Sequence, residues 1–311
     1  MTTLSRSVRP IVMAAAALAM IVIAGAACSS PTPTPEPTAT PTPTPTPDDT
    51  DLTGILATTD LSVGSNRVAF LLLSPRALVN VPQVSLTSTF VEDASPSETA
   101  TAAFYQWPFG TRGNYVTQLE FDRAGEWELF VEAEGADGEI SAARIPLHVK
   151  DSSFTPAVGT SPPMEVNKTA AVVSSLDEIT SWSTPDPDLY QATIPQLVGD
   201  GMPSVVVFAS PALCTSPTCG PQVETVSELK DEYRDSVSFV HVEVYDNPHE
   251  IQGDLTTASY SPLVDTWGLS MIEDYLNESF VFILDRDGRI ASKYEGYASF
   301  DELVAGLRQV L

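Results

Sequence analysis

Cysteine, histidine and basic side chains are all scarce in this sequence. Its 311 residues hold three cysteines and three histidines, and 15 Lys and Arg stand against 41 Asp and Glu, for a formal net charge of -26. Phosphate backbones and anionic lipid head groups repel so acidic a chain, which argues against a nucleic-acid partner. His148, His241 and His249 are far apart in the sequence. No His-rich metal site is therefore visible, and we expect no cofactor.

Calcium binding is also not indicated, because the acidic residues are scattered singly and no Asp-x-Asp-x-Asp-Gly loop is present. The closest segment, Asp285-Arg286-Asp287-Gly288, is better explained as a hairpin turn. We therefore expect the acids to form a solvated surface.

The N-terminal segment is typical of an exported protein. Arg6 and Arg9 precede an uncharged run over residues 11–27. This run is short and rich in alanine, so it fits the hydrophobic region of a secretory signal better than a membrane-spanning helix. Residues 1–27 are predicted to be a signal peptide, although an uncleaved anchor is an open alternative.

The first cysteine ends this segment. Ala26-Ala27-Cys28-Ser29-Ser30 resembles the cleavage box of bacterial lipoproteins, although Gly25 stands where that box usually has a bulky aliphatic residue. The resemblance implies that Cys28 is lipidated and that the protein lies on the outer face of a bacterial membrane, in the cell envelope. Ala24-Gly25-Ala26 also fits ordinary signal peptidase, which would release a secreted protein.

Residues 31–47 are almost pure Pro-Thr alternation, broken at Glu36 and at residues 38–40. Such a segment cannot bury a core and adopts extended polyproline II, which rises about 3.1 Å per residue. We interpret residues 28–50 as a spacer between the lipidated cysteine and the folded domains; the alternative is a Pro-rich docking motif.

Residues 51–152 are predicted to form an all-β domain. Short apolar or alternating runs are separated by Gly, Pro, Asn or Asp. The clearest run lies in residues 125–133, where Trp127 and every second residue after it share an apolar face and the intervening glutamates face water. So many short strands in about 100 residues favour an antiparallel sandwich. The runs are residues 67–73, 84–91, 102–107, 115–121, 127–133 and 140–149.

Two segments of this domain, Gly113-Asn114-Tyr115 and residues 121–127, resemble the penultimate hairpin of Ig-like domains in bacterial envelope proteins. The resemblance implies an Ig-like β-sandwich. No ionisable cluster stands out, so we expect a spacer or interaction module without chemistry of its own. Residues 153–184, punctuated by prolines, are predicted to be a connector in which residues 171–179 add an edge strand or a short helix.

Residues 185–311 alternate between helical and strand patterns, as α/β domains do. Helical spacing occurs over residues 189–198, 223–233, 261–276 and 300–311, and strand patterns occur over residues 204–210, 237–245, 280–284 and 289–294. The last two strands flank the turn at residues 286–288 and are predicted to form a hairpin.

This order carries a further resemblance. Val205-Val206-Val207-Phe208 before the cysteines, residues 228–233, residues 239–248 and the hairpin over residues 280–290 resemble the thioredoxin-like superfamily. That resemblance implies thiol–disulfide exchange by a cysteine pair at the start of the first long helix. Carried over by position, Cys214 is the nucleophile, Cys219 is the resolving thiol, and the two form a disulfide.

The chain departs from the family pattern at four places. The pair has the spacing Cys-x4-Cys, two residues longer than the family motif. Val207 stands where many thioredoxins have a buried acid, and Leu213 replaces the usual tryptophan before the first cysteine. Ser279 occupies the place of the proline that lines the substrate groove of the family.

The residues around the pair set expectations for its chemistry. Ser216-Pro217 is a helix-start signature and Gly220-Pro221 a competing one, so Cys219 lies near a helix N-terminus, which favours its thiolate. Two cysteines five apart cannot face each other on one helix, so Cys214 lies in the preceding loop. Residues 201–229 contain no Lys, Arg or His, and Glu224 and Glu228 oppose ionisation, which predicts weakly acidic thiols.

Three functions remain open. The first is a membrane-anchored thiol–disulfide oxidoreductase acting on envelope or secreted proteins. The second is a non-catalytic envelope binding or assembly module, in which the Cys214–Cys219 disulfide is structural. The third is a peroxidase or copper-delivery variant of the fold, for which residues 210–214 would be the peroxidase segment and His241 the candidate copper ligand.

Overall fold

The computed structural model describes residues 51–311 apart from 76–77 and 273–277. The described residues all belong to one compact unit, Thr46–Leu311. The signal peptide, Cys28 and the Pro-Thr spacer lie outside the described residues, so the expectations for them stay predictions. Within the described ranges, no helix has the length and apolar character needed to cross a membrane.

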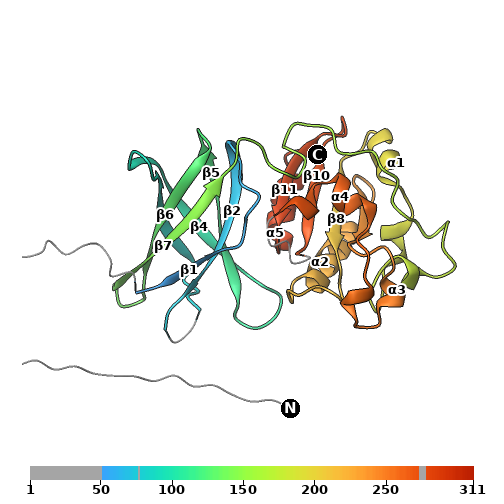
Figure 1. Cartoon of the computed structure of the whole chain (residues 1–311), viewed down its shortest axis with the longest axis horizontal. Coiled ribbons are helices and arrows are strands. Elements are labelled where there is room, and N and C mark those ends of the chain that lie inside the picture. Colours follow the sequence, from blue (N-terminus) through green and yellow to red (C-terminus); the bar gives the residue numbers. More distant parts are fainter. Residues whose placement is uncertain (1–50, 76–77, 273–277) are drawn as a thin grey trace, which may run out of the picture. The chain divides into compact units, whose positions relative to one another are not determined.

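The N-terminal part is an all-β domain with seven antiparallel strands (Figure 1). Hydrogen bonds join them in the order β1-β2-β5-β4-β3-β6-β7. Each predicted run falls in a strand of this sheet, although two of them end one residue beyond the strand, at Val91 and Trp107. The strands are β1 Thr53–Leu56, β2 Gly64–Leu73, β3 Gln83–Phe90, β4 Ser95–Gln106, β5 Gly113–Phe121, β6 Gly125–Glu134 and β7 Ile140–Val149.

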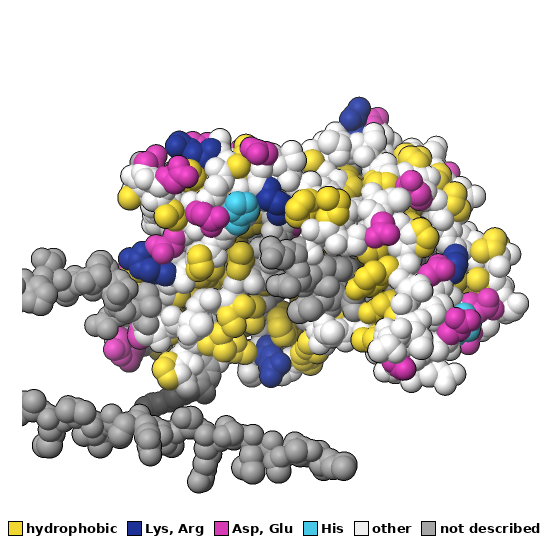
Figure 2. All heavy atoms as spheres, in the orientation of Figure 1, with side chains coloured by type: hydrophobic (Ala, Val, Ile, Leu, Met, Phe, Trp, Pro, Cys, Tyr) yellow, Lys and Arg dark blue, Asp and Glu magenta, His cyan; other side chains and the backbone are white. Residues whose placement is uncertain are grey.

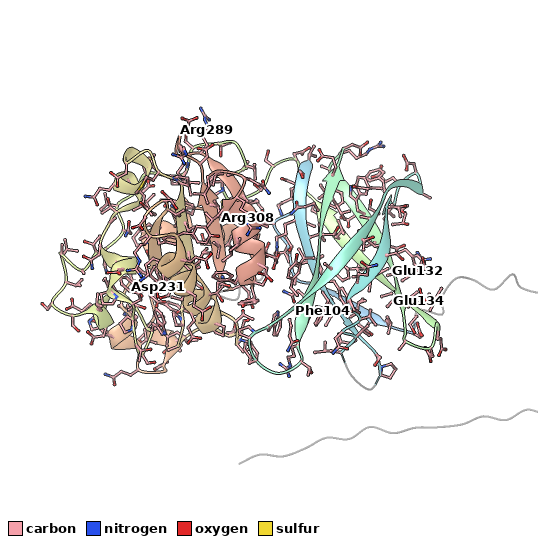
Figure 3. The ribbon with its side chains drawn as sticks, turned by 180° about the vertical axis from the view of Figure 1, so that it is seen from behind. Phe104, Glu132, Glu134, Asp231, Arg289 and Arg308 are labelled. Carbon is pink, nitrogen blue, oxygen red and sulfur yellow. A yellow bond between two sulfur atoms is a disulfide. The ribbon has the colours of Figure 1, made fainter. Side chains whose placement is uncertain are left out.

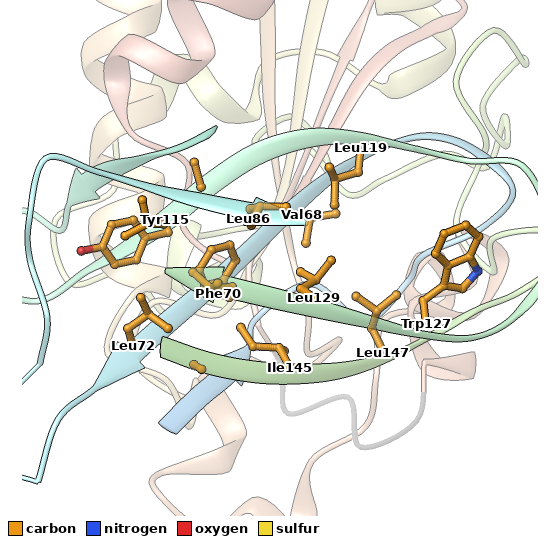
Figure 4. Packing of buried hydrophobic residues seen from close by; sticks show 14 of the residues in the cluster. Val68, Phe70, Leu72, Leu86, Tyr115, Leu119, Trp127, Leu129, Ile145 and Leu147 are labelled. Carbon is orange, nitrogen blue, oxygen red and sulfur yellow. The ribbon is translucent and has the colours of Figure 1, made fainter. Parts of the chain in front are cut away.

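The two ends of this sheet meet around one core. The amide of Leu52, just before β1, donates to the carbonyl of Ala142 on β7 at 3.0 Å. Inside, the ring of Trp127 packs edge-on against those of Phe90 and Phe121, with centroids 5.3 and 5.1 Å apart. Figure 4 shows Trp127 at one end of this core, with Leu129 and Leu147 between it and Phe70. The alternation predicted for β6 is confirmed, because Trp127 and every second residue after it up to Ala133 are buried, while Glu132 and Glu134 are exposed (Figure 3).

The C-terminal part is a small α/β domain built on a four-stranded sheet of order β11-β10-β8-β9. Strands β8 and β9 are parallel, whereas β10 runs antiparallel to both β8 and β11. A helix, α2, connects β8 to β9, and α5 follows the β10–β11 hairpin. This order of strands and helices along the chain is the one that the sequence predicts, so the predicted α/β class is confirmed. The elements are β8 Ser204–Ala209, α2 Cys219–Tyr233, β9 Ser238–Glu243, β10 Phe280–Leu284, β11 Ile290–Glu295 and α5 Phe300–Leu307.

Two helices expected from spacing are broken. The single helix predicted over residues 261–276 is interrupted at Gly268, whose φ of +72° is left-handed backbone that favours glycine. The helix predicted over residues 189–198 is also split, because Pro195 lacks an N–H and fits only in the first turn of a helix. The resulting segments are η2 Pro187–Tyr190, α1 Ile194–Gly199, α4 Pro262–Thr266 and η4 Leu269–Met271. Two further short helices, α3 Pro248–Ile251 and η3 Leu255–Thr257, follow β9.

The connector contains one short 3-10 turn, η1 Leu176–Glu178, where an edge strand or short helix was predicted. Its side chains pack on the second domain. Ile179 is buried, and Leu176 and Trp182 lie against the same apolar cluster as Cys219. The domain boundary at residues 153–184 stays a prediction, but this contact brings the connector to the cysteine loop.

Acidic side chains are scattered over the face of the molecule seen in Figure 2 and form no continuous patch on it, as the sequence predicts. Across the described part of the chain, no group of three or more His, Cys, Asp and Glu could hold a metal ion.

Candidate functional site: the Cys214–Cys219 loop

The two cysteines lie at the junction between the central strand β8 and helix α2. Every residue of β8 is buried, which fixes the point where the loop begins. The amide of Cys214 donates to the carbonyl of Ser210 at 3.0 Å and turns the loop back toward the helix. A disulfide joins Cys214 to Cys219, with Cα atoms 6.2 Å apart, inside the usual range for such bonds. The predicted disulfide and the loop position of Cys214 are therefore confirmed.

The two sulfurs differ in accessibility. Cys219 is fully buried, whereas Cys214 is only partly buried. An incoming thiolate attacks the sulfur that it can reach, and access is one of the factors that set the exchange rate. Of the two, Cys214 is the cysteine that keeps surface exposed to a protein partner.

The start of α2 differs from both sequence alternatives. Cys219 is the first residue of the helix and Thr218 is its N-cap, so Pro217 precedes the helix and Gly220-Pro221 lies inside its first turn. The side chain of Ser216 instead accepts a hydrogen bond from the Thr218 amide at 3.3 Å. Cys219 thus occupies the first helical position, where the unpaired backbone amides favour a negative sulfur.

A carboxylate that the sequence analysis did not single out holds the second half of the loop. The hydroxyl of Thr218 donates to Glu278 at 3.3 Å, and Ser216 also bonds to this carboxylate. Burial raises the pKa of Glu278, and the charge of Glu295 on β11 acts in the same direction, while the two hydroxyls oppose them. A partly buried acid therefore lies beside the residue that precedes Cys219.

A second carboxylate holds the first half of the loop. Glu243, at the end of β9, is buried and accepts from the Ser181 amide at 2.7 Å, from the Ser181 hydroxyl at 2.8 Å and from Ser210. Ser181 in turn accepts from the amide of Ala212 at 3.1 Å. Burial raises the pKa of Glu243, although these hydrogen bonds oppose it. The connector thereby becomes part of the cysteine site.

Val207 and Ser279, two of the family departures, are both fully buried. Val207 pairs with His241 of β9 in the parallel register. Because its side chain is apolar, Val207 cannot relay protons as a buried acid at this position would. Ser279 lies just before β10, and its carbonyl accepts from the amide of Gly296 at 2.9 Å. The acids near the loop come from β9 and from residue 278 instead of from β8.

His241, the candidate copper ligand, already has partners on both ring nitrogens. Its Nε2 lies 3.0 Å from the carbonyl of Ala209, which can only accept, so Nε2 carries the proton. Its Nδ1 therefore accepts from the hydroxyl of Tyr190 at 2.8 Å. Burial lowers the pKa of His241 to about 4, so the ring is neutral at pH 7. These contacts favour a structural role, and the ring has no nitrogen left for a metal.

A cavity of about 250 Å³ adjoins this region and is lined by His241, Glu243 and residues 165–168 of the connector, among others. His241 and Glu243, the two buried polar side chains of β9, thus line a cavity between the edge of the sheet and the connector. The arrangement as a whole offers one chemistry, exchange at a disulfide with one reachable sulfur.

Comparisons with known proteins add little to this description. No protein-family model and no curated protein matches the sequence. Among solved structures, a thio-disulfide isomerase from Thermus thermophilus aligns with a TM-score of 0.31 and 16% identity, covering 50% of this chain and 96% of that chain. A likeness this distant carries no argument. The α/β description of the C-terminal domain rests on its own strand order and connections.

Proposed function

We propose that the protein exchanges thiols and disulfides with envelope or secreted proteins through Cys214 and Cys219. The observation that carries the proposal is the disulfide between β8 and the first residue of α2, with Cys214 partly exposed and Cys219 buried. Thioredoxin topology presents a loop at this junction to partner proteins.

The atoms, protons and electrons of the exchange balance between the cysteine pair, the partner protein and water, with no cofactor. In the reducing direction, the Cys214 thiolate attacks a partner disulfide, forms a mixed disulfide and releases one partner thiolate, which takes a proton from water. Cys219 then loses its proton and attacks the Cys214 sulfur. The second partner thiolate leaves, and two electrons have moved from the pair to the partner. The oxidising direction is the reverse.

The proposed location is the outer face of a bacterial membrane. The uncharged segment before Cys28 and the Pro-Thr spacer after it support a lipid anchor followed by an extended tether. An extracytoplasmic compartment is also one in which disulfides form and persist. Cleavage without lipidation would give a secreted protein with the same site.

We propose that the N-terminal domain is an Ig-like interaction arm. Its strand order supports this assignment, because β1-β2-β5-β4 followed by β3-β6-β7 corresponds to the two sheets of a seven-stranded immunoglobulin constant-type domain. Here β3 and β4 are also hydrogen-bonded, so the sheet is continuous. The arm would hold a partner near the cysteine loop.

One alternative is favoured by a specific observation. Glu243 and Glu278 hold the two halves of the loop in place, which suits a structural disulfide in a binding or assembly module. The absence of Lys, Arg and His from residues 201–229 also disfavours a strongly acidic thiol. The two functions differ in whether the native pair exchanges with a partner.

Trapping separates them. Full-length Cys219→Ser protein, expressed in an envelope, should accumulate mixed disulfides through Cys214 that dithiol releases. The matched Cys214→Ser variant should not, because its remaining sulfur is buried. If neither variant traps a partner and the wild-type disulfide resists excess dithiol until the protein unfolds, the disulfide is structural.

A further inference from the structure

The carboxylate of Glu278 is tied to the cysteine loop across 60 residues of sequence. Its partners, Ser216 and Thr218, flank Pro217, and their hydroxyl oxygens lie 2.6 Å apart. Thr218 is itself almost fully buried and caps the helix that begins at Cys219. The three side chains form a short polar chain that ends one residue before the buried sulfur.

The sulfur of Cys219 is therefore subject to two opposite electrostatic effects. The N-terminus of α2 stabilises negative charge on Cys219, whereas a nearby carboxylate destabilises it. Residues 201–229 supply no cation of their own to offset the carboxylate. The carboxylate of Glu295 on β11 acts on Glu278 as well, and it too is acidic. The environment of the opened pair therefore depends on whether Glu278 carries its charge.

We infer that Glu278 is a positioning residue that couples opening of the disulfide to a proton, and this inference rests on the proposed thiol–disulfide exchange. Through Thr218 and Ser216 its carboxylate holds the loop and disfavours thiolate at the start of α2. When two electrons open the Cys214–Cys219 bond, the sulfurs take up protons from water more readily than they would beside a neutral side chain. When Glu278 is protonated, thiolate forms more readily.

The test measures the acidity of the thiols in the reduced, otherwise intact protein, by thiolate absorbance near 240 nm against pH. Glu278→Gln should lower the pKa of the more acidic thiol by about one, a roughly ten-fold gain in thiolate at a fixed pH below that value. Glu232→Gln is the matched control, since it removes one charge from an exposed position near the far end of α2. It should change the thiolate fraction by less than about two-fold.

The conservative variant separates charge from structure. Glu278→Asp keeps the charge and should remain near the wild-type value. A purely structural role would instead leave Glu278→Gln near the wild-type value, because Gln keeps the side-chain length and an oxygen acceptor for Thr218, and it would shift Glu278→Asp. If Glu278→Gln does not fold, Glu278→Ala is the second neutral variant and should lower the same thiol pKa by a similar amount, because it also removes the charge. An unchanged thiol pKa in the neutral variant that folds overturns the inference.

The outcome is independent of the trapping experiment, because the thiol titration needs no partner. Trapping by Cys219→Ser with no change in acidity in Glu278→Gln overturns this inference alone. A change in acidity without any trapping overturns the proposed function alone.

Discussion

Arg67 on β2 donates through Nε to the carboxylate of Glu302 on α5 at 2.9 Å, with both side chains almost completely buried. The same guanidinium donates to the carbonyls of Glu295 and Tyr297, each at 3.2 Å. A residue of the first domain is thus enclosed by the last strand and helix of the second. A buried ion pair of this kind adds little stability compared with an apolar pair, but it is costly to break from one side.

Arg67→Met should therefore destabilise the protein by about 3–5 kcal/mol, because it leaves the Glu302 carboxylate buried without its partner. Chemical denaturation at pH 7 measures the loss. Arg234→Met is the control, since Arg234 and its partner Asp231 are largely exposed and should contribute less than about 1 kcal/mol. A loss from Arg67→Met as small as that of the control would contradict the buried pair.

Stability should also fall in mildly acidic solution because of His241. Its pKa is about 4 in the folded protein and about 6.5 when unfolded. The folded value is the lower one, so the unfolded chain binds the proton first. The stabilisation is complete above pH 6.5 and lost as the pH falls toward 4, by roughly 3 kcal/mol.

The measurement is the free energy of unfolding at several pH values between 7.5 and 4. His241→Gln should flatten this dependence, whatever its effect at pH 7.5. His148→Gln, at an exposed site, should retain it. Parallel curves for wild type and His241→Gln would show that another group is responsible.

Gly268 has a conformation and a contact that exclude any side chain. Its φ is +72°, and an added Cβ would come within 2.1 Å of the carbonyl oxygen of Phe154. Gly268→Ala should cost about 2 kcal/mol or more and lower the thermal midpoint. Gly199→Ala, at the end of α1 and facing open space, should change stability by no more than about 1 kcal/mol. Equal effects of the two substitutions would refute the close contact.

Lipidation of Cys28 predicts a mature protein that begins at an acylated cysteine and partitions with membranes. Intact-mass analysis of the mature chain checks the prediction. Cys28→Ser should abolish acylation and release the protein from membranes, whereas Ser29→Ala should change neither. A mature N-terminus at Ala27, without lipid, would contradict it.

The parts predicted correctly from sequence are those set by local patterns. Alternation at Trp127 identified the buried face of β6, and the apolar run before Cys214 identified β8 and the cysteine loop. The prediction of one continuous helix over residues 261–276 was wrong because a single residue, Gly268, interrupts it. Spacing reports which residues share a face and does not detect a conformation that only glycine adopts.

The carboxylates around the site could not be predicted because tertiary contacts place them there. Glu278 meets Thr218 across 60 residues, and Glu243 meets Ser181 across 62. Glu243 lies on the same strand face as His241, and the alternation there could equally describe a solvent-facing row. The sheet and the connector bury both of them instead.

The reduction potential of the Cys214–Cys219 pair tests the central claim most directly. Equilibration of the full-length protein with glutathione or dithiol buffers, followed by alkylation of free thiols, gives the value. Thiol–disulfide exchange predicts a potential between about -120 and -270 mV, where exchanging pairs of this topology lie. A potential below about -300 mV, with reduction occurring only on unfolding, would contradict the account and identify the disulfide as structural.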